Sequence, residues 1–299
     1  MGRRSSHGGP DGLAVVDKAA GWTSHDVVAK ARGLLGTRKV GHSGTLDPDA
    51  TGVLLLGVGK VTRLLRFLGL PSKTYTGVVV LGTATSTLDA SGEVTGTWDM
   101  AGVTVAEVRE AAAALTGEIL QVPPMVSAIQ VDGRRLHELA REGIEVERAA
   151  RPVTVHRFEV GEAVTPGCFP IEVECSSGTY IRSLAADVGT ALGGGAHLRD
   201  LRRTAIGSFT EDQAVPLDAL RPEALLSPAA ALRDLPAVTV DATTAADVAF
   251  GKVLAIEALG VTGPGPWPVL DEAGTLLAVY EPHRGGSAKP TVVLPRGGG

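Results

Sequence analysis

The chain has 299 residues, of which 44% are hydrophobic and 20% charged, as is typical of a globular protein with one large and one small domain or two medium ones. No apolar run is long enough to span a bilayer, and residues 1–11 are basic and Gly-rich without the apolar core of a signal peptide, which predicts a flexible arm on a cytoplasmic protein. The net charge of −5 excludes a uniformly basic surface, so a nucleic-acid-binding protein of this composition must gather its lysines and arginines on one face.

The first part of the chain predicts alternating strands and helices. Residues 12–17 (GLAVVD) are mostly apolar and predict a short buried strand. Thr23 and Asp26 form a capping box that predicts the start of a helix, and Gly36 predicts its end. A glycine-bounded strand, a short amphipathic helix and a further strand follow at residues 53–59, 61–69 and 73–82.

The middle of the chain adds helices and strands in an irregular order. Thr104 and Glu107 form a second capping box, which predicts a helix that ends at Gly117. Two further helices are predicted at residues 134–143 and 179–194, and two strands at residues 153–160 and 170–175. Because strands and helices mix without a βαβ rhythm, the sequence predicts an α+β fold around a mixed or antiparallel sheet.

The character of the sequence changes near residue 233. A short capped helix, a stretch rich in Gly and Pro and the hairpin-like VLDEAGTLLAVYE follow this point. We therefore predict a domain at residues 12–232 and a small β-rich domain at residues 233–299 that ends in a loose tail.

The loop GHSGTLDPDATG contains the first candidate for chemistry, Asp47. Pro48 disfavours a helical backbone at the preceding residue and holds it extended, while Gly44 and Gly52 allow tight turns. A carboxylate presented from a stiff loop at the edge of a sheet suits a nucleophile. Asp49 stands in the same loop and does not face Asp47 across a substrate, so the pair does not predict a glycosidase dyad.

The segment GHSGTLDPDATGVLLLGVGKVTRLL closely resembles the signature of the TruB group of pseudouridine synthases. Five further segments resemble that group in the same order, over residues 13 to about 215: LAVVDKAAGWTSHDVV, KTYTGVVVLGTATSTLDASGEV, VPPMVSAIQVDGRRLHELAREG, CSSGTYIRSLAADVG and AHLRDLRRTAIGSF. The resemblance implies the pseudouridine synthase fold, with a mixed, largely antiparallel central sheet flanked by helices. It implies, more weakly, a PUA-like β-rich domain at the C-terminal end.

The resemblance implies four catalytic residues. Asp47 resembles the essential aspartate of the family, which attacks the target nucleoside covalently, and Arg182 resembles its ion-pair partner. A guanidinium beside a carboxylate is expected to lower the pKa of that carboxylate and to fix its orientation. Tyr75 resembles the aromatic residue that stacks on the target uracil, and Tyr180 resembles a second tyrosine of the site, suited to proton transfer at C5 or to packing on the base.

Four other residues are implied to bind substrate. Leu201 resembles an apolar residue on the other side of the base, and His42 a histidine that fills the gap left by a flipped-out uridine. Lys73 and Arg202 occupy basic positions. Residues 121–150 are expected to form an insertion that closes over the RNA. The candidates for a basic RNA-binding face are Arg38, Lys39, Arg134, Arg135, Arg199, Arg202 and Arg203.

The function implied is the isomerisation of uridine 55 in the T loop of tRNA to pseudouridine. This reaction moves a glycosidic bond from N1 to C5 without redox or phosphoryl chemistry, so we expect no cofactor and no metal. Cys168 and Cys175 fit that expectation, since their spacing matches neither a zinc site nor a disulfide framework. Attack by the aspartate at C1′ and attack at C6 of the ring both remain open, and we expect a monomer.

Three alternatives compete with this interpretation. The first is an RNA-binding protein that remodels the tRNA elbow. The second is a guide-RNA-dependent synthase that acts with partner proteins. The third is an unrelated hydrolase built on the Asp47–Arg182 pair. The first predicts that Asp47 is dispensable, and the third predicts product release from free nucleosides. The short termini of this sequence argue against the second.

Overall fold

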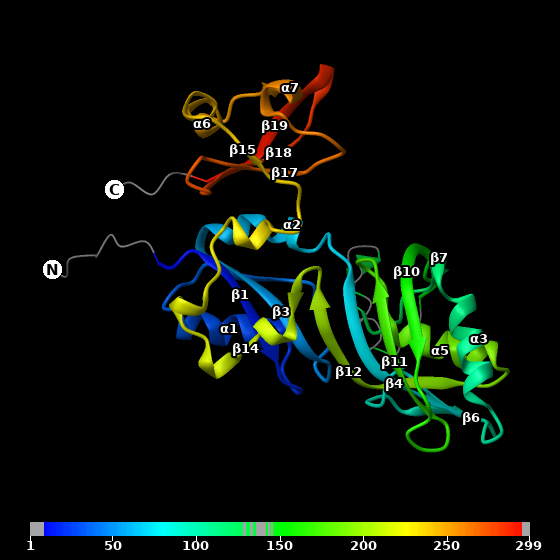
Figure 1. Cartoon of the computed structure of the whole chain (residues 1–299). Coiled ribbons are helices and arrows are strands. Elements are labelled where there is room, and N and C mark those ends of the chain that lie inside the picture. The colour runs from blue at the N-terminus through cyan, green and yellow to red at the C-terminus, as the bar shows by residue number, and fades with distance from the viewer. Residues whose placement is uncertain are drawn as a thin grey trace.

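The computed structural model describes residues 9–127, 130–131, 134–135, 142, 144 and 146–294. Most of the chain surrounds one long, twisted sheet, and the C-terminal residues form a separate small lobe on it (Figure 1). The main path of the sheet runs in the order β14 (Val215–Pro216), β1 (Gly12–Lys18), β3 (Thr51–Val58), β12 (Ala196–Ile206), β4 (Lys73–Leu81), β11 (Cys168–Cys175), β10 (Arg151–Val160) and β7 (Gly117–Gln121). Two short strands extend it, β2 (Val40–Ser43) beside β3 and β13 (Phe209–Thr210) beside β12.

The sheet is mixed and largely antiparallel. Along this path only the pairs β1–β14 and β3–β12 are parallel. The parallel pair β3–β12 joins the N-terminal half of the sheet to the half built around β4. The predicted α+β class is therefore confirmed.

Both faces of β1 and β3 are covered, which explains why their sequences are apolar at successive positions. Ala14 and Val16 face one core together with three helices, α1 (Ser24–Leu34), α3 (Val105–Ala114) and α5 (Ile181–Ala191). Leu13 and Val15 face a second core on the opposite side of the sheet. The two predicted capping boxes are present at the starts of α1 and α3.

Three segments differ from the sequence prediction. The amphipathic stretch at 61–69 forms a 3₁₀ helix (Gly59–Leu64) followed by one turn of α-helix, α2 (Leu65–Leu68). The segment at 196–206, for which the sequence predicts no element, forms the central strand β12. The predicted helix at 134–143 begins instead with a two-residue strand, β9 (Arg134–Arg135), paired with β8 (Gln130–Val131), and residues 136–141 and 143 lie outside the described residues.

The C-terminal lobe holds a second sheet in the order β15 (Val238–Thr239), β17 (Trp267–Leu270), β18 (Leu276–Pro282), β19 (Ser287–Val293) and β16 (Leu254–Ala255). It carries two short helices, α6 (Ala242–Ala249) and α7 (Ile256–Leu259). The remaining regular elements are the small hairpin β5 (Thr83–Thr85) and β6 (Val94–Thr97) and 3₁₀ helices at Glu211–Gln213, Leu217–Ala219, Pro222–Ala224, Ala230–Leu232 and Arg284–Gly286.

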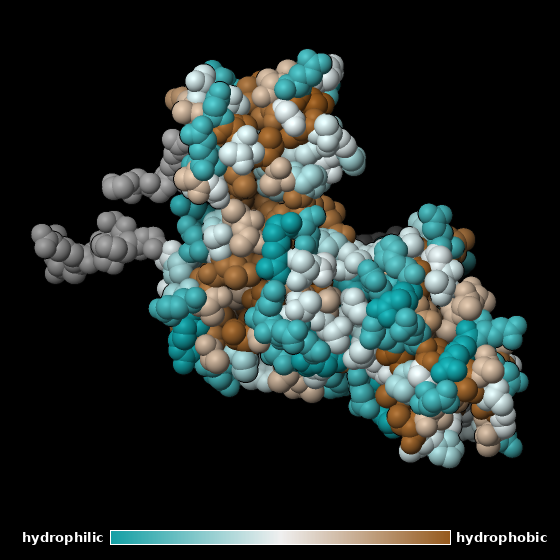
Figure 2. All heavy atoms as spheres, viewed as in Figure 1, coloured by the Kyte–Doolittle hydropathy of each residue, from teal (hydrophilic) through white to brown (hydrophobic). Residues whose placement is uncertain are grey.

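The second core holds the two lobes together. Phe67 of α2 belongs to the same buried apolar cluster as Val279 and Val292 of the small sheet, and apolar side chains are visible in the neck between the lobes (Figure 2). Polar contacts add to this packing, since Arg66 pairs with Glu281 at 2.6 Å. The small lobe is thus docked on the 3₁₀ helix Gly59–Leu64 and on α2, which cover the face of β1 and β3 opposite α1 (Figure 1). No helix in the described part of the chain is long and apolar enough to cross a membrane.

Candidate active site

The loop between β2 and β3 places Asp47 at the edge of the sheet. Gly44 and Gly52 have φ angles of +74° and +98°, which favour glycine. At Gly52 a Cβ would also lie 2.2 Å from the backbone oxygen of Arg203, so that position admits no larger residue. The side chain of Ser24, at the start of α1, both accepts from Leu46 N and donates to Leu46 O, at 3.0 and 3.2 Å. The loop is therefore held by Ser24 of α1 at Leu46 and packs against the β12 backbone at Gly52.

Lys18, the last residue of β1, also holds the loop of Asp47 in place. Its ammonium group is buried and donates to the carbonyl oxygens of Ala19, Trp22 and Pro48, at 3.0, 2.7 and 2.8 Å. Burial lowers the pKa of Lys18 to about 8. Since Pro48 follows Asp47 directly, Lys18 is a positioning residue for the carboxylate. Lys18 was not predicted as a site residue, although a buried strand that ends in a lysine is a signal for one.

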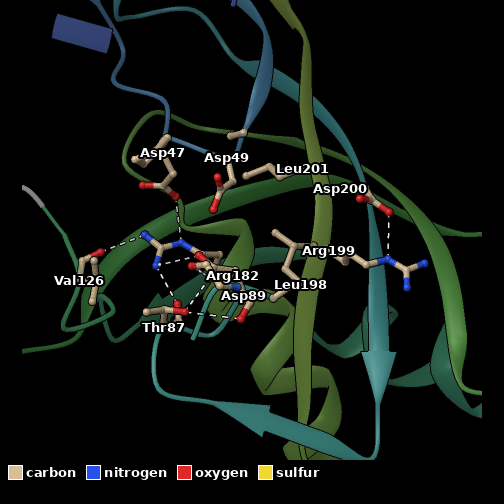
Figure 3. Close-up of a pocket in the computed structure, with 14 residues that line it drawn as sticks. Asp47, Asp49, Thr87, Asp89, Val126, Arg182, Leu198, Arg199, Asp200 and Leu201 are labelled. Atoms are coloured by element: carbon tan, nitrogen blue, oxygen red, sulfur yellow. Dashed lines mark hydrogen bonds and ion pairs between the residues drawn. The ribbon is translucent and has the colours of Figure 1, made fainter. Parts of the chain in front are cut away.

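Arg182 holds the carboxylate of Asp47. Its Nε lies 2.9 Å from Oδ2 of Asp47, while Nη1 and Nη2 donate to the carbonyl oxygens of Thr87 and Val126, at 2.7 and 2.9 Å. The Arg182 side chain is only 4% exposed, whereas that of Asp47 is 41% exposed. The guanidinium is thus fixed inside the protein, and the carboxylate that it orients faces a cavity (Figure 3).

A second carboxylate, Asp89, approaches the same guanidinium, with Oδ2 3.5 Å from Nη1 of Arg182. Figure 3 shows Asp47 and Asp89 on different sides of Arg182. Oδ1 of Asp89 accepts from the hydroxyls of Thr87 and Ser91, both at 2.6 Å. Asp89 was not predicted as a site residue, because nothing in the sequence shows that residues 89 and 182 meet.

The charge state of Asp47 corrects one expectation from the sequence. Arg182 acts to lower the pKa of Asp47, as expected, but desolvation by burial is the larger effect, and Asp89 adds to it. The pKa of Asp47 is therefore raised above its ordinary value. The guanidinium offsets part of the cost of burying the carboxylate without reversing it.

Two cavities meet at Asp47, and Arg182 and Leu201 also line both. The larger has a volume of about 280 Å³ and is lined by Tyr75, Tyr180 and Lys73 as well. Six of the eight predicted site residues thus line one cavity, although they come from the loop after β2 and from β4, α5 and β12. The arrangement places a carboxylate, a buried aromatic ring and an aliphatic side chain around one space.

A bulge in β12 brings Leu201 to the cavity. Pairing with β4 shifts register between Arg199 and Arg202, and Asp200 has a φ of +57°, which is uncommon for a residue other than glycine. The extra residues of the bulge change the local direction of the strand, and Leu201 lines both cavities as a result. Arg199 instead pairs with Asp200 and points away from Arg182 (Figure 3).

Tyr180 is held by a residue that the sequence analysis did not single out. Gln121, at the end of β7, is buried and makes two hydrogen bonds to the Tyr180 backbone: its Oε1 accepts from Tyr180 N at 2.7 Å, and its Nε2 donates to Tyr180 O at 3.1 Å. Tyr180 precedes α5, whose second residue is Arg182. Gln121 therefore aligns the start of α5, with Tyr180 at the N-cap and Arg182 in the first turn.

Two predicted substrate-binding residues lie outside the lining of both cavities. His42, on β2, packs edge-on against His25 at 5.3 Å between ring centroids, and burial lowers its pKa. Arg202 pairs with Asp17 and Glu211. Their roles remain predictions. Arg203, expected on a basic surface, is fully buried, so that part of the basic-face hypothesis is wrong.

Activity is expected to fall as the pH is lowered, because Asp47 becomes protonated. Since burial raises the pKa of Asp47, this loss should occur at a higher pH than is usual for an aspartate. In an Asp89→Asn variant, which removes one charge that raises this pKa but keeps an oxygen acceptor for Thr87 and Ser91, the acid limb should move to lower pH. The measurement is kcat/KM against pH for both proteins. An acid limb that moved to higher pH in the variant would contradict this account.

Comparison with known proteins agrees with the fold. A family model described as "TruB family pseudouridylate synthase (N terminal domain)" matches residues 32–181, and one described as "tRNA pseudouridylate synthase B C-terminal domain" matches residues 182–235. The tRNA pseudouridine synthase B of Rhodococcus jostii is 50% identical over 290 residues, which cover 95% of this chain and 93% of that protein. The protein of the same name from Streptomyces coelicolor is 48% identical over 289 residues, or 93% and 96% of the two chains.

Solved structures show the same architecture. The structure titled "Crystal Structure of a Cbf5-Nop10-Gar1 Complex" matches with a TM-score of 0.75 and 27% identity, over 96% of this chain and 86% of that one. Another, of an H/ACA RNP bound to a substrate RNA containing 2′-deoxyuridine, matches with a TM-score of 0.72 and 26% identity, over 95% and 86% of the two chains.

The fold and the matched relatives are those of a pseudouridine synthase, an isomerase. The chain belongs to the TruB family of pseudouridylate synthases. Among the residues that the structure describes, no cluster of His, Cys, Asp or Glu is arranged to hold a metal ion.

Proposed function

We propose that this pseudouridine synthase acts on tRNA, that it converts uridine 55 of the T loop, and that Asp47 is the nucleophile. The relatives named tRNA pseudouridine synthase B support a tRNA substrate, since they match over nearly the whole chain. The resemblance in the sequence motifs directs the proposal to uridine 55. The observation that carries it is the Asp47 carboxylate, oriented by Arg182 at the cavity that Tyr75 and Leu201 line.

The cavity suits a nucleotide that has left its stack. A uridine in a folded loop must flip out to reach Asp47, which costs a few kcal/mol. Stacking on Tyr75, which is 8% exposed, and packing against Leu201 offset that cost. Tyr180 lines the same cavity and is suited to proton transfer at C5 or to packing on the base.

The test is to incubate the purified protein with an unmodified tRNA transcript and to map pseudouridine at each uridine of the T loop. Wild type is expected to modify position 55 alone, and the Asp47→Asn variant is expected to modify none. Modification at another position would reject the assignment to uridine 55. Undiminished modification by the variant would reject Asp47 as the nucleophile.

A second function, the remodelling of the tRNA elbow, is compatible with the same fold and does not need the carboxylate. A folding assay with Asp47→Asn separates the two, because only remodelling survives the loss of the nucleophile.

A further inference from the structure

Two buried cations lie together at the cavity that Tyr75 lines. Lys73 is 5% exposed and Arg203 is fully buried, and both line this cavity. They lie on the adjacent strands β4 and β12, where Arg203 pairs with Tyr75. A Cβ at Gly44 would lie 3.3 Å from Nη1 of Arg203 and 3.4 Å from Cε of Lys73, so both side chains converge on the first residue of the loop that carries Asp47.

Neither cation has a carboxylate partner among the residues that the structure describes. Both donate to carbonyl oxygens, and Arg203 also contacts the Tyr75 side chain, with its guanidinium carbon 6.0 Å from the ring centroid. Nε and Nη2 of Arg203 donate to Val53 O and Gly44 O, at 2.7 and 2.9 Å. Nζ of Lys73 donates to Gly69 O at 3.2 Å, which leaves N–H donors of the ammonium group for another acceptor. Burial, with a smaller effect from Arg203, lowers the pKa of Lys73 to about 8.

This arrangement contrasts with the other wall of the cavity. There Arg182 faces two carboxylates, Asp47 and Asp89. A buried charge without an opposite charge destabilises a fold, and an apolar side chain in place of Lys73 would avoid that cost. The structure therefore keeps positive charge beside the base-binding space at the expense of stability, which indicates that negative charge arrives there during function.

We infer that Lys73, backed by Arg203, binds the negative charge that forms on the uracil ring during isomerisation. The inference rests on the proposed function and assigns to these two residues the recognition of a ring anion. It explains why positive charge is buried beside Tyr75, whose ring lies against the face of the base in the proposed complex.

The electron count requires such a charge. When the N1–C1′ bond breaks, its electron pair stays on the ring, and the uracil anion carries the charge on its nitrogens and carbonyl oxygens while Asp47 bonds to C1′. The ring then forms the C5–C1′ bond as Asp47 leaves, C5 loses a proton and N1 gains one. If Asp47 adds to C6 instead, the electron pair that it displaces lies on C5 and O4 of the ring. Either route places negative charge where a fixed cation lowers the barrier.

The test compares the single-turnover rate of formation of the C5-linked nucleoside by wild type and Lys73→Met, with tRNA affinity measured alongside. Methionine keeps an unbranched stem and removes the charge. Lys30→Met serves as control, because Lys30 is an exposed lysine on α1 that pairs with Asp218. Each protein is assayed on tRNA that carries uridine and on tRNA that carries 5-fluorouridine, since fluorine withdraws electrons and stabilises the same ring anion. C5 of 5-fluorouridine has no proton to lose, so on that tRNA the rate measured is that of forming the C5–C1′ bond, with the fluorine retained on C5.

Lys73→Met is expected to lower the rate on uridine by about 100-fold, without weakening tRNA binding and without lowering stability in denaturant. On 5-fluorouridine the defect should shrink markedly, because the substrate then supplies part of the stabilisation. Lys30→Met should match wild type on both substrates. Lys73→Gln, which keeps a hydrogen-bond donor but no charge, should show the same pattern and provides a second reading if the methionine variant folds poorly.

Two outcomes would overturn the inference. An equal defect on both substrates would show that Lys73 does not respond to charge on the ring. A loss of tRNA affinity as large as the loss of rate, with a salt dependence reduced by about one counterion, would assign Lys73 to a phosphate. If instead the proposed function were wrong, wild type itself would form no C5-linked product in the T loop, which distinguishes that failure from a failure of the inference about Lys73.

Discussion

Replacing Asp47 with Asn is expected to lower the rate of pseudouridine formation by on the order of 10⁴-fold or more, because an amide cannot form the covalent bond that the carboxylate forms. Asparagine has nearly the same shape and keeps an oxygen that accepts from Arg182, so tRNA affinity should change little. The measurement is the single-turnover rate with saturating enzyme, together with a binding isotherm for the same tRNA.

Asp49→Asn is the matched control for this experiment. Asp49 stands two residues further along the same loop, is exposed, and forms no ion pair among the described residues. It should retain the wild-type rate to within a few-fold. If Asp47→Asn stayed within about tenfold of wild type, the barrier would differ by only about 1.4 kcal/mol, and Asp47 would not be the nucleophile.

Replacing Arg182 with Met is expected to damage both activity and stability. The change removes the ion pair to Asp47 and leaves the carbonyl oxygens of Thr87 and Val126 without their donor. It also leaves Asp47 and Asp89 facing the same space without the cation between them. Breaking a buried pair in this way costs about 3–5 kcal/mol, and the pKa of Asp47 should rise further because the main group that lowers it is lost.

Denaturant unfolding and a pH profile of kcat/KM measure the two effects separately. The matched control is Arg109→Met, since Arg109 also pairs with a carboxylate, Glu162, and donates to a carbonyl, Val160 O, but is 48% exposed. Its loss should cost about 1 kcal/mol or less. Equal destabilisation by the two substitutions would show that the buried network around Arg182 has no special importance for the fold.

The sequence determined the elements whose signals are local. The capping boxes at Thr23 and Thr104 set the starts of two helices, because the side chain of a cap bonds to a backbone group three residues away. The loop around Asp47 was equally predictable, because Pro48 restricts the backbone before it and Gly44 and Gly52 permit tight turns. The sequence motifs also selected Tyr75 and Arg182 as site residues, and the fold brings both to the cavity of Asp47.

Only the tertiary structure decided which charges are buried. The segment that forms β12 has no strand period, because Arg199, Asp200 and Arg202 stand at a bulge within it, and it becomes a strand only between β3 and β4. Arg203 is buried there because it donates to the carbonyl oxygens of Gly44 and Val53, which are distant in sequence. Whether a charged side chain is buried depends on partners that only folding supplies. For that reason the parts played by Asp89 and Lys18, and the burial of Lys73 and Arg203 side by side, emerged from the fold and not from the sequence.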